Sequence, residues 1–272
     1  MTFKNRVLYI AISTLSLSCA QAFDLGQELR NAAQALPGSG LSGYSAQEEV
    51  AIGRQIAGNL LGAAPLVADK KLQKYVNNVG RQVASMSERP DLAWHFGVIE
   101  SDDINAFAAP GGYIFVTRGL YLRLNNEAEL AGVLAHEIGH VIKKHHLNIL
   151  QQSKMLDLGS QLISRQIDGN EKITKLIGSG AEIVSRSLDK KAEFEADRIG
   201  VVLTARAGYD AYGLPAVLQE IGHNSPDDNS VTLLFKTHPH PDARLAQLSL
   251  AMDDRFDKLQ GLTLAKRFYR IK

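Results

Sequence analysis

The sequence predicts a mainly helical α+β domain with a small antiparallel sheet. Most of the chain carries apolar residues at helical spacing, whereas the stretch between residues 93 and 120 changes to alternating and β-branched residues typical of short strands. Hydrophobic residues make up 45% of the chain and charged residues 22%, a composition that can bury a globular core. The formal net charge of +1 provides no basic field that would attract nucleic acid, so we expect no nucleic-acid partner.

Residues 1–22 have the features of an export signal. Lys4 and Arg6 precede a short apolar run, and an A-x-A cleavage sequence ends at Ala22. We therefore expect cleavage after Ala22 and export to the periplasm. Cys19, the only cysteine of the sequence, offers the alternative of a lipid anchor and peripheral association with the outer membrane, but it lacks the leucine three places ahead that lipoprotein signals prefer.

Turn and capping residues predict the segments that follow. The segment 23–44 contains "LPGSGLSG" and is expected to form a flexible tether. Ser45 and Glu48 make a capping box that opens a helix. Apolar residues at helical spacing predict a second helix from about Asp69 to Met86.

Short strands are expected in "AWHFGVIES" and "YIFVTRGL", residues 93–101 and 113–120. Pro110, Gly111 and Gly112 between them predict a turn.

Helices are predicted in the remainder of the chain. Asn126 is a favourable N-cap for a helix with a pronounced apolar stripe. Another helix is predicted from about Asp189 to Ala207, with Gly208 as its C-terminal stop, and Pro241 suits the first turn of a further helix. The glycine-interrupted segment 147–187 is predicted to be helical, as either a lid or plug or two plain core helices.

The helix after Asn126 contains "HEIGH", residues 136–140. Residues four apart lie on the same face of a helix, so His136 and His140 can bind one zinc ion. Zinc lowers the pKa of its water to about 7. Glu137 is then placed to accept the proton of the attacking water and to deliver it to the leaving nitrogen.

The alternative interpretation of this motif is a polar helix face with solvated histidines. The apolar stripe of the helix argues against it, because two buried histidines and a glutamate would be costly without a cation. Gly139 also argues against a solvated helix face. A glycine within a helix costs about 1 kcal/mol relative to alanine, so we expect that another backbone or a metal approaches closely there.

A catalytic zinc site usually has three protein ligands. His146 lies ten residues after His136, where one class of zinc protease has its third histidine, but that class requires a glycine at the position of Lys143. We therefore expect the helix to continue, with His145 and His146 forming its solvated end.

The third ligand is predicted in "KKAEFEADRIG". Glu193 and Asp197 are four residues apart and share one helix face, so Glu193 can complete a site of two histidines and one glutamate while Asp197 orients His136 or His140. Glu195 should point to solvent. The alternative for Glu193 is a salt bridge to Lys190 or Arg198.

Four motifs in this order resemble peptidase family M48, a family of zinc metalloendopeptidases: "NAFAAPGGYIFVTRGL", "HEIGH", "EFEAD" and "THPHP". The resemblance covers about residues 45–250, leaving 251–272 as a C-terminal tail. It implies a gluzincin-like metalloprotease domain with one zinc ion per chain, held by His136, His140 and Glu193, with Glu137 as catalytic base. Asp197 matches the aspartate of the family's E-x-x-A-D motif. No run of 18 apolar residues is present, so we expect a soluble, exported member.

The resemblance also points to His238 in "THP". Its imidazole could donate a hydrogen bond to the oxyanion of the reaction, or it could close the resting site as a fourth ligand. The alternatives are that His238 is an ordinary loop histidine, or that His240 takes its place.

We expect the substrate to bind in an extended conformation along a sheet edge at Asn105–Ala108, so that main-chain hydrogen bonds supply the affinity. Such binding selects unfolded chains, so the expected substrates are unfolded or misfolded envelope polypeptides and the expected role is protein quality control. A chaperone-like binding protein, with a zinc site but little turnover, is the alternative. The oligomeric state stays open.

Overall fold

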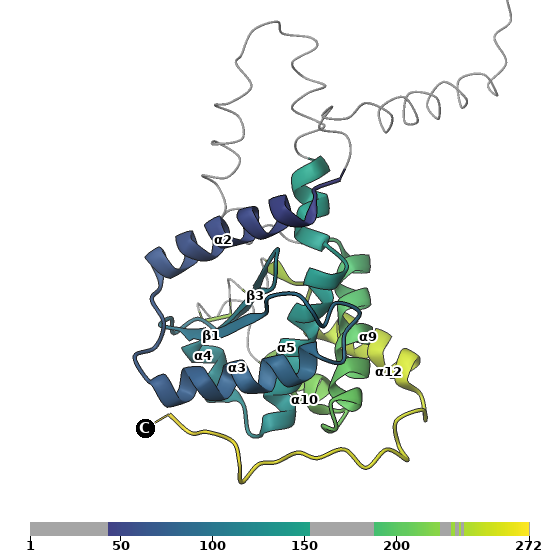
Figure 1. The fold of residues 1–272 in the computed structure, drawn as a ribbon. Coiled ribbons are helices and arrows are strands. Elements are labelled where there is room, and N and C mark those ends of the chain that lie inside the picture. The colour runs from purple at the N-terminus through teal and green to yellow at the C-terminus, as the bar shows by residue number, and fades with distance from the viewer. Residues whose placement is uncertain (1–42, 153–187, 224–229, 232–233, 235–236, 272) are drawn as a thin grey trace, which may run out of the picture. The chain divides into compact units, whose positions relative to one another are not determined.

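The computed structural model describes residues 43–152, 188–223, 230–231, 234 and 237–271 (Figure 1). The chain divides into two units, Met1–Gly43 and Tyr44–Lys272, and the second contains every element described below. The predicted signal peptide and nearly all of the predicted tether lie outside the described residues, as does most of the predicted lid segment.

The strands of the described residues form one three-stranded sheet in the order β1-β3-β2. These strands are β1 (His95–Ile99), β2 (Ala106–Ala109) and β3 (Tyr113–Thr117). β2 and β3 are antiparallel and are joined by the predicted turn, in which Gly111 and Gly112 have positive φ angles of 75° and 93°. β1 and β3 are parallel, so the sheet is mixed, whereas the sequence predicted an antiparallel one.

The path of the chain explains the mixed sheet. β1 and β2 run in opposite directions but are not neighbours, and the space between them is filled by β3. A tight turn makes β3 antiparallel to β2, and β3 is therefore parallel to β1. The turn residues specify the hairpin locally, whereas the position of β1 depends on a pairing between distant segments.

Helices cover both faces of the sheet (Figure 1). α2 (Ala46–Ala63) packs on one face, where Ile56 joins Phe107 and Phe115 in one apolar cluster. α3 (Lys70–Ala84) and α5 (Glu127–Ile142) contribute to the main core on the other face. Successive strand residues point to opposite faces, so coverage on both sides explains why every residue of β2 is buried.

The helices begin where the sequence predicted, and the predicted caps Ser45 and Asn126 are confirmed. The N-caps are Ser45 for α2, Asp69 for α3, Asn126 for α5 and Asp189 for α9 (Lys190–Arg206). Further helices with both ends in the described part of the chain are α4 (Arg118–Arg123), α10 (Gly213–Gly222) and α12 (Pro241–Met252), the last of which starts with the predicted proline. No helix within the described ranges is long and apolar enough to cross a membrane.

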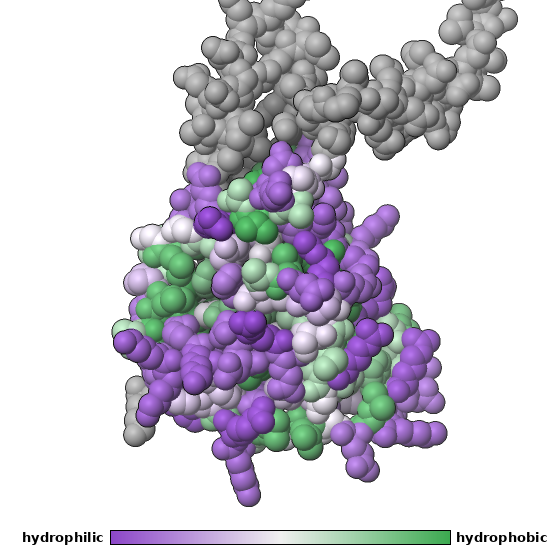
Figure 2. Space-filling model, viewed as in Figure 1, coloured by the Kyte–Doolittle hydropathy of each residue, from purple (hydrophilic) through white to green (hydrophobic). Residues whose placement is uncertain are grey.

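The C-terminal segment 251–272 was expected to follow the domain as a tail, but several of its side chains pack against the domain. The Phe268 side chain is buried in the main core. The Arg267 guanidinium pairs with the buried Glu127 carboxylate, which also accepts hydrogen bonds from two tyrosine hydroxyls. The domain therefore extends through these residues. Figure 2 shows hydrophilic side chains spread over the visible face, with smaller apolar groups between them.

α5 and α9 cross at close range because each presents a glycine to the other. A Cβ atom at Gly139 would lie 3.1 Å from the Cα atom of Ala196, and one at Gly200 would lie 3.1 Å from the backbone nitrogen of His136. The expected close approach at Gly139 is thus made by the backbone of α9. This crossing brings two distant segments of the sequence together at the site described next.

Candidate active site

Four buried side chains converge where α5 crosses α9: His136, His140, Glu193 and His238. Each offers one ligating atom, and these atoms lie within 4.8 Å of one another. The Nε2 atoms of His136 and His140 are 3.0 Å apart. The Glu193 carboxylate lies 3.4 Å from Nε2 of His140 and 3.7 Å from Nε2 of His136.

The arrangement fits a divalent metal ion. Ligand atoms about 2.0–2.1 Å from a tetrahedral zinc ion lie about 3.3 Å from one another, close to the separations found here. Oε1 of Glu193 is buried and has no hydrogen-bond partner among the described residues, as expected for an atom that binds a metal. Two imidazoles and a carboxylate are ligands that zinc accepts.

The protonation states of these side chains also suit metal binding. Burial lowers the pKa of His140 well below its ordinary value, so its imidazole is neutral. Burial alone would raise the pKa of Glu193, but the interactions with His238 and the charge of Arg244 outweigh it and lower that pKa, so the carboxylate is ionised. Metal ligands must be deprotonated, and both of these are.

Asp197 supports His136 from behind. Its Oδ1 atom lies 2.9 Å from Nδ1 of His136, on the opposite side of the ring from the ligating Nε2 atom. Arg244 of α12 donates to both carboxylate oxygens of Asp197, at 2.9 Å from Nε and 2.6 Å from Nη2. Burial opposes ionisation of Asp197, but Arg244 outweighs it and lowers the pKa of this carboxyl. The structure thus places Asp197 beside His136, one of the two histidines it was expected to orient.

Arg244 was missed in the sequence, although it is only 4% exposed and lies 3.8 Å from Glu193 as well. One signal could have found it. Glu193 and Asp197 were predicted on one buried helix face, and two buried carboxylates require a compensating cation. Arg244 precedes the apolar Leu248 by one helical turn in the helix predicted to start at Pro241.

Glu137 and His238 line two cavities. The first lies against β2, where Ala106, Phe107 and Ala108 contribute to its wall. The second is larger and mostly apolar, and α10 supplies several of its side chains. Burial raises the pKa of Glu137 above that of an ordinary glutamate, which makes it a better proton acceptor near neutral pH.

His238 belongs to the cluster, whereas His240 does not. Nδ1 of His238 lies 2.9 Å from Oε2 of Glu193, and the residue is 7% exposed, so it is not an ordinary loop histidine. His240 is the N-cap of α12, and its side chain is 39% exposed. The position of His238 suits both roles considered for it, a fourth ligand and a hydrogen-bond donor beside the reacting carbonyl.

Comparison with known proteins agrees with this geometry. The family model described as Peptidase family M48 matches residues 70–251. The chain belongs to peptidase family M48. This confirms the resemblance drawn from the four motifs, and with it the predicted class of enzyme, a metalloendopeptidase. The family implies a metal, which the buried cluster could hold.

Individual relatives of this M48 chain are similar over part of their length. The Beta-barrel assembly-enhancing protease of Yersinia pestis is 32% identical over 81% of this chain and 48% of that protein, and the protein of the same name from Escherichia coli (strain K12) is 32% identical over 79% and 47%. The Mitochondrial metalloendopeptidase OMA1 of Arabidopsis thaliana is 28% identical over 67% of this chain and 36% of that protein. The chain spans about half the length of the first two relatives.

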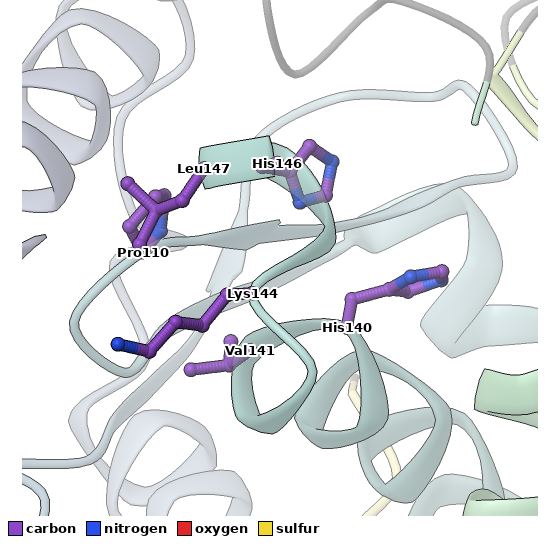
Figure 3. Close-up of a pocket in the computed structure, with 6 residues that line it drawn as sticks. All are labelled: Pro110, His140, Val141, Lys144, His146 and Leu147. Carbon is purple, nitrogen blue, oxygen red and sulfur yellow. The ribbon is translucent and has the colours of Figure 1, made fainter. Parts of the chain in front are cut away.

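The prediction that the helix of the M48 motif continues through His145 and His146 is wrong. α5 ends at Ile142, and Lys144 then adopts a positive φ angle of 57°, which turns the chain back. Figure 3 shows the result, in which His140 and His146 project to one side of this turn and Lys144 to the other. His145 and His146 are buried, at 8% and 7% exposure, instead of solvated. Residues other than glycine seldom adopt a positive φ angle, so a lysine at position 144 gave no indication of this turn in the sequence.

Neither His145 nor His146 is in the group of candidate ligands found among the described residues. Glu195 points away from that group as expected, with its side chain 42% exposed, but it is not free in solvent: it lies 3.4 Å from His145 and 3.8 Å from Lys143. In the described part of the chain, Glu193 pairs with the histidines and Arg244, and not with Lys190 or Arg198.

Proposed function

We propose that this protein is a zinc metalloendopeptidase that cleaves unfolded or misassembled polypeptides of the cell envelope. The observation that carries the proposal is the convergence of His136, His140 and Glu193 on one buried point, with Glu137 next to it in the same helix. A purely structural metal site would have no use for a glutamate at this position with a raised pKa.

In the proposed reaction, His136, His140 and Glu193 would hold one zinc ion, which would supply polarisation of the scissile carbonyl and activation of water. Glu137 accepts the proton of the attacking water and returns it to the leaving nitrogen. Asp197 keeps His136 in the tautomer that presents Nε2 to the metal. His238 either donates a hydrogen bond to the developing oxyanion or closes the resting site as a fourth ligand.

The edge of the sheet supports an extended, unfolded substrate. β2 is an edge strand, and its residues Ala106–Ala108 share a cavity with Glu137 and His238. A peptide that pairs with this strand would bind through its main chain, because sheet hydrogen bonds do not involve side chains. Most of the main chain of a folded protein is already paired within its own structure, so this mode favours unfolded chains.

The location of the proposed substrates follows from two further observations. Residues 1–22 carry the features of an export signal, which supports a periplasmic protein, with a lipid anchor at Cys19 and outer-membrane association as the alternative. Two relatives are named Beta-barrel assembly-enhancing protease, which supports substrates among envelope proteins.

Glu137→Gln tests the catalytic role. We expect the full chain to keep its zinc content and fold but to lose cleavage of unfolded casein by about 100- to 10,000-fold, the usual contribution of a general base. Glu220→Gln, on the exposed face of α10, serves as the matched control and should cleave at the wild-type rate. Wild-type cleavage that survives zinc chelation, or an active Glu137→Gln protein, would contradict the proposal.

A chaperone-like binding protein with a zinc site is the second candidate, and one observation favours it. His238 brings the number of buried candidate ligands to four, as in closed structural zinc sites. Such a protein would suppress aggregation of an unfolded outer-membrane protein without cleaving it, and Glu137→Gln would leave this activity unchanged.

A further inference from the structure

The turn after α5 places a second histidine behind His140. The ring of His145 meets that of His140 edge to face, with centroids 5.1 Å apart, and the two Nδ1 atoms are separated by 2.9 Å. We propose that His145 is a positioning residue, which fixes the tautomer and ring orientation of His140 and is itself oriented by Glu195. This inference rests on the proposed zinc site.

The tautomers follow from the position of each nitrogen. Nε2 of His140 faces His136 and Glu193, at 3.0 and 3.4 Å, so it is the nitrogen that would bind the metal. A neutral imidazole that binds through Nε2 carries its proton on Nδ1 and must donate it. The acceptor at 2.9 Å is Nδ1 of His145. His145 then carries its own proton on Nε2, which faces the Glu195 carboxylate at 3.4 Å. Each donor in this series of contacts, from His140 through His145 to Glu195, thus faces an acceptor.

His136 provides a comparison within the same site. Histidines that bind metals usually donate their second nitrogen to a carboxylate, a carbonyl or water, which orients the ring and strengthens the ligand. His136 has the Asp197 carboxylate at 2.9 Å for this purpose. His140 has His145 in the equivalent place, and Glu195 lies beyond it. α9 thus supplies both outer carboxylates as well as the ligand Glu193.

Glu195 could not reach His140 directly. It lies two residues from both Glu193 and Asp197 in α9, so it points to a different side of that helix. The buried ring of His145 spans the gap between Glu195 and His140. This explains why a half-exposed glutamate outside the metal cluster still has a partner inside the fold.

The backbone conformation at Lys144 makes this contact available. In a continuing helix, His145 would be five residues after His140 and would point about 140° away from it. The left-handed conformation of Lys144, which costs about 1–2 kcal/mol for a residue with a side chain, turns His145 back onto α5. The Lys144 ammonium lies 3.4 Å from the buried Glu49 carboxylate, which holds the turn from the other side.

The test compares variants of the full chain by their affinity for zinc, measured by competition with a chelator at one pH. His145→Leu keeps the bulk but removes the acceptor, and we expect it to weaken zinc binding by about 10- to 100-fold. His145→Asn places a carbonyl oxygen near the position of Nδ1, and we expect it to restore affinity to within about threefold of wild type. Glu195→Gln should weaken binding by about two- to fivefold, because the contact is long and partly exposed.

Two further measurements separate positioning from general damage to the fold. At about pH 8, well above the unfolded pKa of histidine of about 6.5, the thermal unfolding of the metal-free His145→Leu protein should match that of the metal-free wild type. The visible spectrum of the cobalt-loaded protein should change in His145→Leu and return in His145→Asn, because it reports the geometry around the metal. His95→Asn, at an exposed position in β1, is the matched control.

The outcomes distinguish this inference from the proposed function. A wild-type protein that binds no zinc overturns both. If wild type binds one zinc ion and His140→Ala does not, but His145→Leu binds as tightly as wild type, only the role of His145 is wrong. If His145→Leu does not fold, the other two variants decide. Near wild-type zinc affinity and cobalt spectrum in His145→Asn, together with weakened zinc affinity in Glu195→Gln, support the role of His145. Wild-type values in Glu195→Gln overturn it.

Discussion

The two histidines of α5 are supported from behind in different ways. Behind His136 lies an ion pair sealed from solvent, in which the side chains of Asp197 and Arg244 are 1% and 5% exposed. Behind His140 lies the neutral ring of His145, followed by Glu195, whose side chain is 42% exposed. Electrostatic interactions weaken where water has access, so the first support is the stronger and the more dependent on an intact fold.

This difference shows that the two ligands of one metal site can depend on the rest of the fold to different degrees. Arg244 belongs to α12 and pairs with Asp197 of α9, which in turn contacts His136 of α5, so the His136 side connects three helices. The His140 side connects only the end of α5 and the exposed face of α9. Damage to either side should weaken metal binding, but damage to the first should cost much more folding stability than damage to the second.

The largest effect is expected from Arg244→Met. This change leaves the buried carboxylates of Asp197 and Glu193 without their cation, and removing one partner of a buried ion pair costs about 3–5 kcal/mol. Urea unfolding of the metal-free full chain measures this loss. Arg54→Met, at an exposed position in α2, should change the free energy of unfolding by no more than about 0.5 kcal/mol. Equal stabilities of the two variants would show that the His136 side is not tied to the fold.

A smaller effect is expected on metal affinity from Asp197→Asn. The amide still accepts a hydrogen bond from His136 but loses the negative charge that strengthens this ligand, so zinc affinity should fall by about 10- to 100-fold. Chelator competition with wild type and Glu195→Gln side by side measures the contrast. Losses of the same size in both variants would mean that the buried and exposed supports are equivalent.

Much of this site could be predicted because its signals are local. Helical spacing alone places His136 with His140, and Glu193 with Asp197. The caps at Ser45 and Asn126 likewise depend on residues three positions apart.

The features that sequence reasoning missed depend on contacts between distant segments. Arg244 reaches Asp197 across 47 positions of the chain, and β1 joins the sheet beside β3 and not beside β2. The turn at Lys144 lacked a glycine, so the energy that holds its positive φ must come from tertiary contacts such as the one with Glu49. No local pattern could have placed His145 behind His140.

The smallest expected effect is on the pH dependence of the unfolding free energy of the metal-free protein. His145 and Asp197 should contribute to this free energy in different pH ranges. Burial lowers the pKa of His145, so below the unfolded value of about 6.5 the unfolded chain binds a proton that the folded chain does not, and stability is lost as the pH falls. The pKa of Asp197 is also lowered, but for an acid this adds stability that is present above the unfolded value of about 3.9 and is lost as the pH falls below it. His145→Asn should therefore reduce the slope of stability below about pH 6.5, by at most about 1.4 kcal/mol per pH unit, while Asp197→Asn should change only the slope below about pH 4. Urea unfolding at half-unit steps of pH measures both slopes. A change in the same pH window for both variants would mean that the two supports do not titrate separately.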